Sequence, residues 1–297
     1  MRKRTAVPAI CAWLLFLSGQ AAGQDLEPRR WTPVPAGVEI VGLGFGVTQG
    51  EVYFDPGLQI EDAELEAQTA ALSYVHAFGL GSRLARFDVA VPWQHIRYDG
   101  LLQGQPATTA RTGRMDTTFR LSVLLAGAEP DPAAKSQTVI GVALAVTAPF
   151  GEYDGARLIN LGQNRWVFRP QAGIVHTRGR WSYEVTGSAY LFTDNGDFYG
   201  RATREQDPLF TLQAHLVYSL PGSGHWLSLG AGYGGAGNTI INGNRVDDDL
   251  RQFLWSLSWG MPLTGRQGLK FAYLESLTHT NKGSDTKTLA VAWTRRF

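Results

Sequence analysis

Apolar residues alternate with polar or small ones in segment after segment of this sequence, and this period of two constrains the fold more than any other feature. One example sets Phe253, Trp255, Leu257, Trp259 and Met261 on one parity against Ser256, Ser258 and Gly260 on the other. Residues 87–94 and 210–218 repeat the pattern. Successive side chains of a strand point to opposite faces, so each segment predicts a strand with one apolar face. Strands of a soluble β-sandwich and of a membrane β-barrel both alternate in this way, so other features must decide between these two fold classes.

The expected strands are unusually long. They cover residues 37–48, 64–78, 84–98, 113–126, 137–150, 164–177, 181–193, 208–220, 226–237, 251–263, 268–279 and 286–297. At about 11–15 residues, most are twice as long as strands of soluble sheets and suit a tilted crossing of a bilayer. After the first 23 residues, no apolar run reaches the roughly 18 residues of a helical membrane span.

The links between these strands alternate between short and long. Short turns include residues 79–83, 178–180, 221–225 and 264–267, whereas the long polar links include 99–112, 151–163, 194–207 and 238–250. Outer-membrane barrels have short periplasmic turns and long outer loops. We therefore expect an all-β fold, a transmembrane antiparallel up-and-down β-barrel of about 12 strands with both termini on the periplasmic side.

Both ends of the chain support export to the outer membrane. Residues 1–23 combine a basic start, an apolar core and a small-residue end, which predicts a signal peptide. The last expected strand carries Leu289, Val291, Trp293 and the terminal Phe297, which resemble the C-terminal assembly signal of bacterial outer-membrane proteins. We expect a Pro-rich segment at 24–36, in the periplasm or the lumen, and the barrel at 37–297. The expected location is the outer membrane of a Gram-negative bacterium.

Charge and composition exclude several classes of function. The 27 Lys and Arg against 26 Asp and Glu give a net charge of +1, which argues against a nucleic-acid binder that neutralises phosphates. The one cysteine, Cys11, lies in the expected signal peptide, so the mature chain has no thiol for a disulfide, a metal site or catalysis. We expect no cofactor and no metal. An aromatic belt at the strand ends would include Trp31, Trp166, Trp181, Tyr183, Trp226 and Tyr233.

No catalytic motif stands out. Residues 230–235 match G-x-G-x-x-G, but a turn-like stretch follows instead of the helix that a dinucleotide fold requires. None of the histidines precedes a serine by two residues, the spacing of the outer-membrane phospholipase and lipid A deacylase families, and G-x-S-x-G is absent. We therefore expect no enzyme. Asp247, Asp248 and Asp249 in an outer loop indicate either a solvated loop or a contact with divalent cations or lipopolysaccharide.

The best functional candidates are polar residues on the inward parity of the expected strands, since a charge on the lipid face costs about 2–4 kcal/mol at the bilayer midplane. These candidates are Arg86, Asp88, Asp116, Arg120, Arg169, Gln171, Glu184, Gln213 and His215. Two roles compete. They either form a salt-bridged network that plugs the barrel or line a pore and set its selectivity.

Several motifs resemble the outer-membrane β-barrel family named for the meta-pathway of phenol degradation. They lie at residues 30–37, 53–56, 60–63, 71–75, 149–153, 158–162, 169–171, 192–195 and 206–209. The resemblance covers essentially the whole mature chain and implies a transporter of the outer membrane. It brings no catalytic motif.

The leading hypothesis is a passive channel for small solutes, among them aromatic-pathway compounds. The alternatives are a closed structural barrel without conductance, which binds lipopolysaccharide or partner proteins through its loops, and a lipid-modifying enzyme. Expected partners are outer-membrane lipid and lipopolysaccharide, the barrel-assembly machinery and a small-molecule solute, with no nucleic acid.

Overall fold

The computed structural model describes residues 26–54, 59–129, 135–246, 250–280 and 283–297. The expected signal peptide and the aspartates at 247–249 lie outside these ranges. Within them, no helix is long and apolar enough to cross a membrane.

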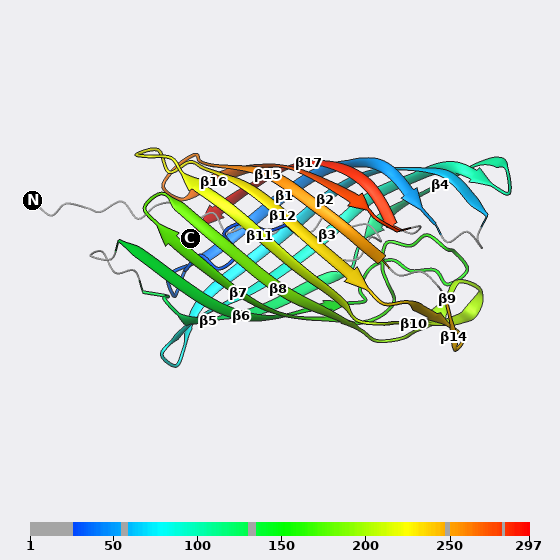
Figure 1. The fold of residues 1–297 in the computed structure, drawn as a ribbon, viewed down its shortest axis with the longest axis horizontal. Coiled ribbons are helices and arrows are strands. Elements are labelled where there is room, and N and C mark those ends of the chain that lie inside the picture. Colours follow the sequence, from blue (N-terminus) through cyan, green and yellow to red (C-terminus); the bar gives the residue numbers. More distant parts are fainter. Residues whose placement is uncertain (1–25, 55–58, 130–134, 247–249, 281–282) are drawn as a thin grey trace, which may run out of the picture.

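The strands close into a barrel whose wall has twelve positions (Figure 1). The wall strands are β1 (Glu39–Tyr53), β2 (Ile60–Leu80), β3 (Arg83–Leu102), β4 (Gln105–Arg114), β5 (Thr117–Ala126), β6 (Ser136–Ala148), β7 (Val167–Arg178), β8 (Trp181–Phe192), β11 (Leu209–Ser219), β12 (Trp226–Ala236), β15 (Leu250–Pro262), β16 (Gln267–Thr278) and β17 (Gly283–Arg296). All pairings are antiparallel, β1 pairs with β17, and β4 and β5 share one position beside β3. The expected all-β antiparallel barrel is confirmed.

The alternation of the sequence explains which face each strand presents. On β12 and β15, Leu229 and Leu257 point outward and are 53% and 50% exposed, whereas Ser228 and Ser256 point inward and are 4% and 1% exposed. An apolar outer face suits hydrocarbon, and closure pairs the backbone groups of the wall with one another. The apolar surface of this fold is therefore its outside.

The wall is taller on one side than the sequence pattern predicts. Residues 99–112, expected as a loop, instead continue β3 and form β4, which pairs with β3 from Trp93–Arg114 to Leu102–Gln105. The strand then breaks at Met115 and Asp116 before β5 begins. β4 lacks an apolar face, so a search for apolar alternation could not find it.

Two of the expected outer loops also contain strands. The links after β8 and β12 carry β9 (Asn195–Phe198), β10 (Ala202–Gln206), β13 (Thr239–Ile241) and β14 (Asn244–Arg245), and these form a separate four-stranded sheet. This sheet lies at the long-loop end of the barrel, at the right of Figure 1, opposite the C-terminus. Pairing of β10 with β13 joins the two links.

The expected aromatic belt is partly wrong. Trp166, Trp181, Tyr183 and Tyr233 are exposed on the outer face. Trp31 and Trp226 are instead inside the barrel, each 1% exposed. Trp226 has inward parity, and its indole packs over Gly260 on the neighbouring strand, where a side chain would collide with it.

Candidate functional site

Residues 26–36 are named here the luminal segment; residues 26–34 lie inside the barrel, whereas Pro35 and Ala36 are exposed. Leu26, Glu27, Arg30, Trp31 and Val34 are all buried. The segment bends where Thr32 donates its N–H to the carbonyl oxygen of Arg29 at 3.2 Å. Since it forms no strand of the wall, side chains hold most of it in place.

A cluster of charged side chains holds the start of the segment. The Arg120 guanidinium donates to both carboxylate oxygens of Glu27, with Nη1–Oε2 at 3.1 Å and Nη2–Oε1 at 3.4 Å. Arg120 lies opposite Asp88 in the β3–β5 register, and its Nε is 3.4 Å from Asp88 Oδ2. Arg86 Nε is 2.9 Å from Asp88 Oδ1, and Arg30 Nη1 is 3.7 Å from both carboxylates. We call these five side chains the guanidinium–carboxylate cluster.

The cluster determines the charge of Glu27. Burial alone would raise the pKa of this carboxyl, but Arg120, Arg30 and Arg86 outweigh burial and lower the pKa from 4.5 to about 2. An ionised carboxylate in a buried site requires such compensation. Three guanidinium groups face two carboxylates here, so the cluster keeps one surplus positive charge even with Glu27 bound.

A second set of contacts ties the segment to β8 and β11. The backbone N–H of Arg29 donates to Glu184 Oε2 at 2.7 Å, and that of Glu27 donates to Gln213 Oε1 at 3.2 Å. His215 lies beside Gln213, with Nε2 3.4 Å from Oε1. Although His215 lies opposite Glu184 in the strand register, Glu184 accepts a hydrogen bond from the segment.

Trp31 anchors the middle of the segment. Its indole Nε1 donates to Thr186 Oγ1 at 2.8 Å. The ring packs over Gly141 and Gly173, where any Cβ atom would collide with it, and among the apolar side chains of Leu124 and Val175. A buried aromatic ring contributes strongly to packing, and its N–H needs a partner, which Thr186 provides.

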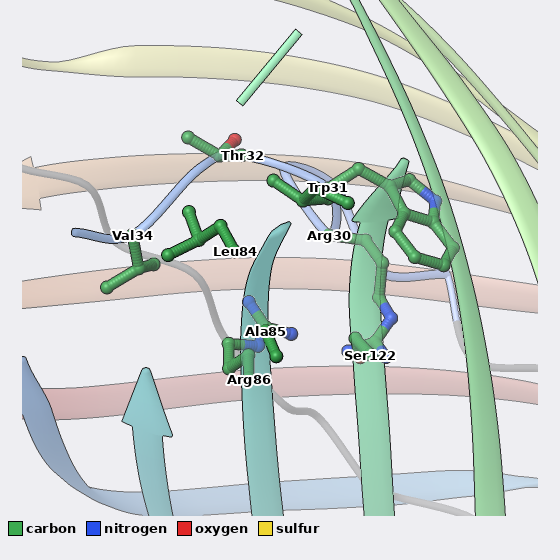
Figure 2. Close-up of a pocket in the computed structure, with 9 residues that line it drawn as sticks. Arg30, Trp31, Thr32, Val34, Leu84, Ala85, Arg86 and Ser122 are labelled. Atoms are coloured by element: carbon green, nitrogen blue, oxygen red, sulfur yellow. Dashed lines mark hydrogen bonds between the residues drawn. The ribbon is translucent and has the colours of Figure 1, made fainter. Parts of the chain in front are cut away.

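Figure 2 shows a small cavity beside this anchor. Its volume is about 20 Å³, and its lining includes Arg30, Trp31, Arg86, Ser122 and Leu124. A cavity of this size holds about one water molecule. A solute of the size of an aromatic acid does not fit in this cavity.

The remaining sequence candidates lie away from the segment's polar contacts. Arg169 donates from Nη1 to the Tyr190 hydroxyl at 2.6 Å. Gln171 donates to Ser188 Oγ at 3.1 Å. Both pairs join β7 to β8. We name the inward faces of β3, β5, β7 and β8 the charged wall.

Asp116 does not belong to the cluster of the lumen. It lies at the break between β4 and β5, where its carboxylate accepts the N–H groups of Gly151 at 2.9 Å and Gln163 at 2.8 Å. It therefore fastens the link between β6 and β7 to the wall.

The opposite side of the lumen has small side chains. We name this surface the small-residue wall; its inward positions include Gly44, Ser228, Gly230, Gly232, Ser256, Ser258, Gly260, Ala272, Ala290 and Ala292. Nothing lies within 4 Å of the point where a Cβ would stand at Gly44. Within the described residues, Ser228 Oγ, Ser256 Oγ and His215 Nδ1 are buried and have no hydrogen-bond partner. Lys270 is the buried cation of this wall.

Residues 48–289 match the family described as "Putative MetA-pathway of phenol degradation". The chain belongs to this family. The resemblance drawn from the sequence motifs is thereby confirmed. No curated protein matches the sequence.

Two solved structures resemble this phenol-degradation family member in fold. The COG4313 outer membrane channel from Pseudomonas putida F1 is 22% identical, with a TM-score of 0.78 over 92% of this chain and 100% of that one. The transport unit of the autotransporter AIDA-I from Escherichia coli is 7% identical, with a TM-score of 0.53 over 95% of this chain and 94% of that one. At these identities the likeness concerns the fold alone.

Three charged residues of this family member were missed in the sequence. Lys270 has inward parity, since it alternates with Phe271 and Tyr273 on the apolar face, so counting parity along residues 268–278 would have found it. Glu27 and Arg30 precede the first strand and have no parity. Their position becomes clear only once the segment is found inside the lumen. No group of three or more metal-ligating side chains occurs in the part of the chain that the structure describes.

Proposed function

We propose that the chain is a passive outer-membrane channel for small solutes, in which the luminal segment narrows the passage. The observation that supports this most is the difference between the side chains on the two halves of the lumen. Many inward positions on one half are Gly, Ser or Ala, and a segment without strand pairing occupies the space beside the charged half. A twelve-stranded wall encloses more space than the eight-stranded barrels that side chains fill.

The charges favour anions among these solutes. The guanidinium–carboxylate cluster has a surplus positive charge, and Lys270 adds another buried cation on the facing wall. Charged rings and patches in a pore select ions of opposite charge. Carboxylates of aromatic-degradation pathways suit both this charge and the family name.

We propose the outer membrane of a Gram-negative bacterium as the location, reached through a signal peptide at residues 1–23. Leu289, Val291, Trp293 and Phe297 would be read by the barrel-assembly machinery. Of these, Leu289 and Phe297 are well exposed on the outer face, accessible to such a partner. Outer-membrane lipid and lipopolysaccharide would surround the wall.

A closed structural barrel is the second candidate, and the buried contacts of Glu27 and Trp31 favour it. A lipid-modifying enzyme is third. His215 Nδ1 and Ser256 Oγ both lie near Gly230, but Leu26 covers the neighbouring Gly232, and the site faces the lumen instead of lipid. Phospholipid or lipid A turnover by the purified protein would revive the enzyme.

The test uses the mature chain refolded into liposomes and a variant that lacks residues 24–36. Uptake of 4-hydroxybenzoate is compared with uptake of a neutral sugar of similar size, because neutral phenol crosses bilayers unaided. A channel predicts faster entry of the anion, and faster entry still in the shortened variant. If neither solute enters through either protein, the structural barrel replaces the channel.

A further inference from the structure

We propose that Arg120 and Arg86 form a binding site for the carboxylate group of a solute, and that Glu27 occupies this site as a carboxylate of the chain itself. Binding of a solute and release of the luminal segment are then coupled. This inference rests on the proposed channel function and adds the chemical class of the ligand and the residues that bind it.

The geometry around Arg120 is that of carboxylate recognition. Two nitrogens of one guanidinium contact two oxygens of one carboxylate at 3.1 and 3.4 Å. This forked pairing is the arrangement by which arginine recognises carboxylates, and a lysine cannot reproduce it. Asp88 holds the fork in place from the other side, through Arg120 Nε at 3.4 Å. The wall itself therefore positions the fork.

Release of the segment removes the carboxylate that faces the Arg120 fork. Glu27 and Arg30 leave together, so Arg86 and Arg120 remain with Asp88 and the site keeps the same surplus positive charge as before. A buried guanidinium that loses a paired carboxylate is less favourable until another anion replaces it. The vacated site would therefore bind an anion from solution, and a carboxylate fits the fork that Glu27 leaves.

Because Glu27 occupies the Arg120 fork, docking of the segment and binding of a solute carboxylate exclude each other. Glu27 and a solute carboxylate cannot both occupy the fork, and the neighbouring cavity of about 20 Å³ is too small to hold a second carboxylic acid. A ligand that binds only the released state shifts the population toward that state. Solute carboxylate thus opens the channel by competition.

The small-residue wall lowers the barrier to release. Ser228 Oγ, Ser256 Oγ and His215 Nδ1 are without hydrogen-bond partners among the described residues while Leu26 and Glu27 lie over this region. Each unsatisfied buried polar group is unfavourable, and this cost is recovered when water reaches the group. The docked state is therefore held mainly by the charged wall and by Trp31.

The test follows release of the segment by chemical labelling. The mature chain has no cysteine, so Val34→Cys introduces a single thiol. Val34 is 4% exposed in a cluster with Ile40 and Val75, and the thiol should react slowly with a maleimide while the segment is docked. We expect 4-hydroxybenzoate to raise the labelling rate about tenfold, within the usual range of coupling between sites. Its neutral isostere 4-hydroxybenzamide should have no effect.

Three variants in the Val34→Cys background locate the effect. Glu27→Gln should label rapidly without ligand, and Arg120→Gln should lose the difference between the acid and the amide. Glu64→Gln, on the exposed face of β2, is the matched control and should behave as the parent. A heat-dependent shift in electrophoretic mobility shows that each variant is a folded barrel.

Equal labelling with the acid and the amide in the parent would overturn the carboxylate site. So would an unchanged response to the acid in Arg120→Gln. These outcomes are separate from the liposome assay. If 4-hydroxybenzoate releases the segment but no solute passes, the result would support the carboxylate site and contradict the channel function.

Discussion

The charged wall and the small-residue wall share the antiparallel strand pairing of one barrel, but their inward side chains differ. On β3 and β5, Arg86, Asp88 and Arg120 reach inward and hold the luminal segment by ion pairs. On β12 and β15, Ser228 and Ser256 fill little space and have no partners in the described part of the chain. The wall determines how wide the barrel is, and we propose that the segment determines how much of that width is open.

The largest effect is expected at Trp31, which anchors the luminal segment on the charged half of the barrel. Trp31→Ala removes a buried indole and its bond to Thr186, which should cost the docked state about 3–5 kcal/mol. Single-channel recording should show long open periods that the parent lacks. Trp181→Ala on the outer face is the control and should leave gating unchanged. Parent-like closure in Trp31→Ala would mean that the ion pairs alone hold the segment.

A smaller effect is expected from adding bulk to the small-residue wall. Gly44→Leu projects a side chain into space that is empty within 4 Å, so the barrel should fold. In a variant that lacks residues 24–36, this change should lower conductance without abolishing it. Phe45→Leu, outward on the same strand, should have no effect. If Gly44→Leu leaves conductance unchanged, the passage does not run along this wall.

The pH response should be weak near neutrality. The docked Glu27 has a pKa of about 2 against 4.5 when free, so its charge stabilises docking fully above pH 4.5 and progressively less as the pH falls toward 2. Labelling at Val34→Cys can follow this after each incubation is returned to neutral pH in the presence of excess maleimide. We expect labelling at pH 5 to be no faster than at pH 7, and faster labelling below pH 4. Release that sets in between pH 7 and pH 5 would contradict the cluster as the main contact.

The smallest effect on conduction is expected at Asp116, which is charged but not bound to the segment. Asp116→Asn weakens the acceptor for the N–H groups of Gly151 and Gln163, which should cost the fold about 1–3 kcal/mol. Thermal unfolding should shift downward while conductance stays at the parent level. An increase in conductance would extend the charged wall to the break between β4 and β5.

Much of this fold could be predicted because a membrane barrel displays its apolar face along each strand. The period of two located most wall strands to within a few residues, as for 181–193 against Trp181–Phe192. It failed for β4, which has no apolar face, and for the small outer sheet, whose strands have only two to five residues. A strand that no hydrocarbon covers needs no apolar face, so apolar alternation cannot reveal it.

The same reasoning predicted only part of the candidate site. Parity placed Arg86, Asp88, Arg120 and Glu184 inward, and these side chains are buried in the lumen. Parity cannot say which of them contact the luminal segment, because the segment has no strand pairing and contacts strands far from it in sequence. Glu27 bonds Arg120 at a separation of 93 residues, and Trp31 bonds Thr186 at 155.

We propose that the luminal segment, residues 26–36, closes the lumen through Glu27 and its contact with Arg120. The most direct measurement adds a synthetic peptide of residues 24–36 to the barrel that lacks them and records the single-channel current. We expect the peptide to restore the closed level, and the same peptide with Glu27→Gln to need a much higher concentration. A current that neither peptide changes, or that both block equally, would contradict this proposal.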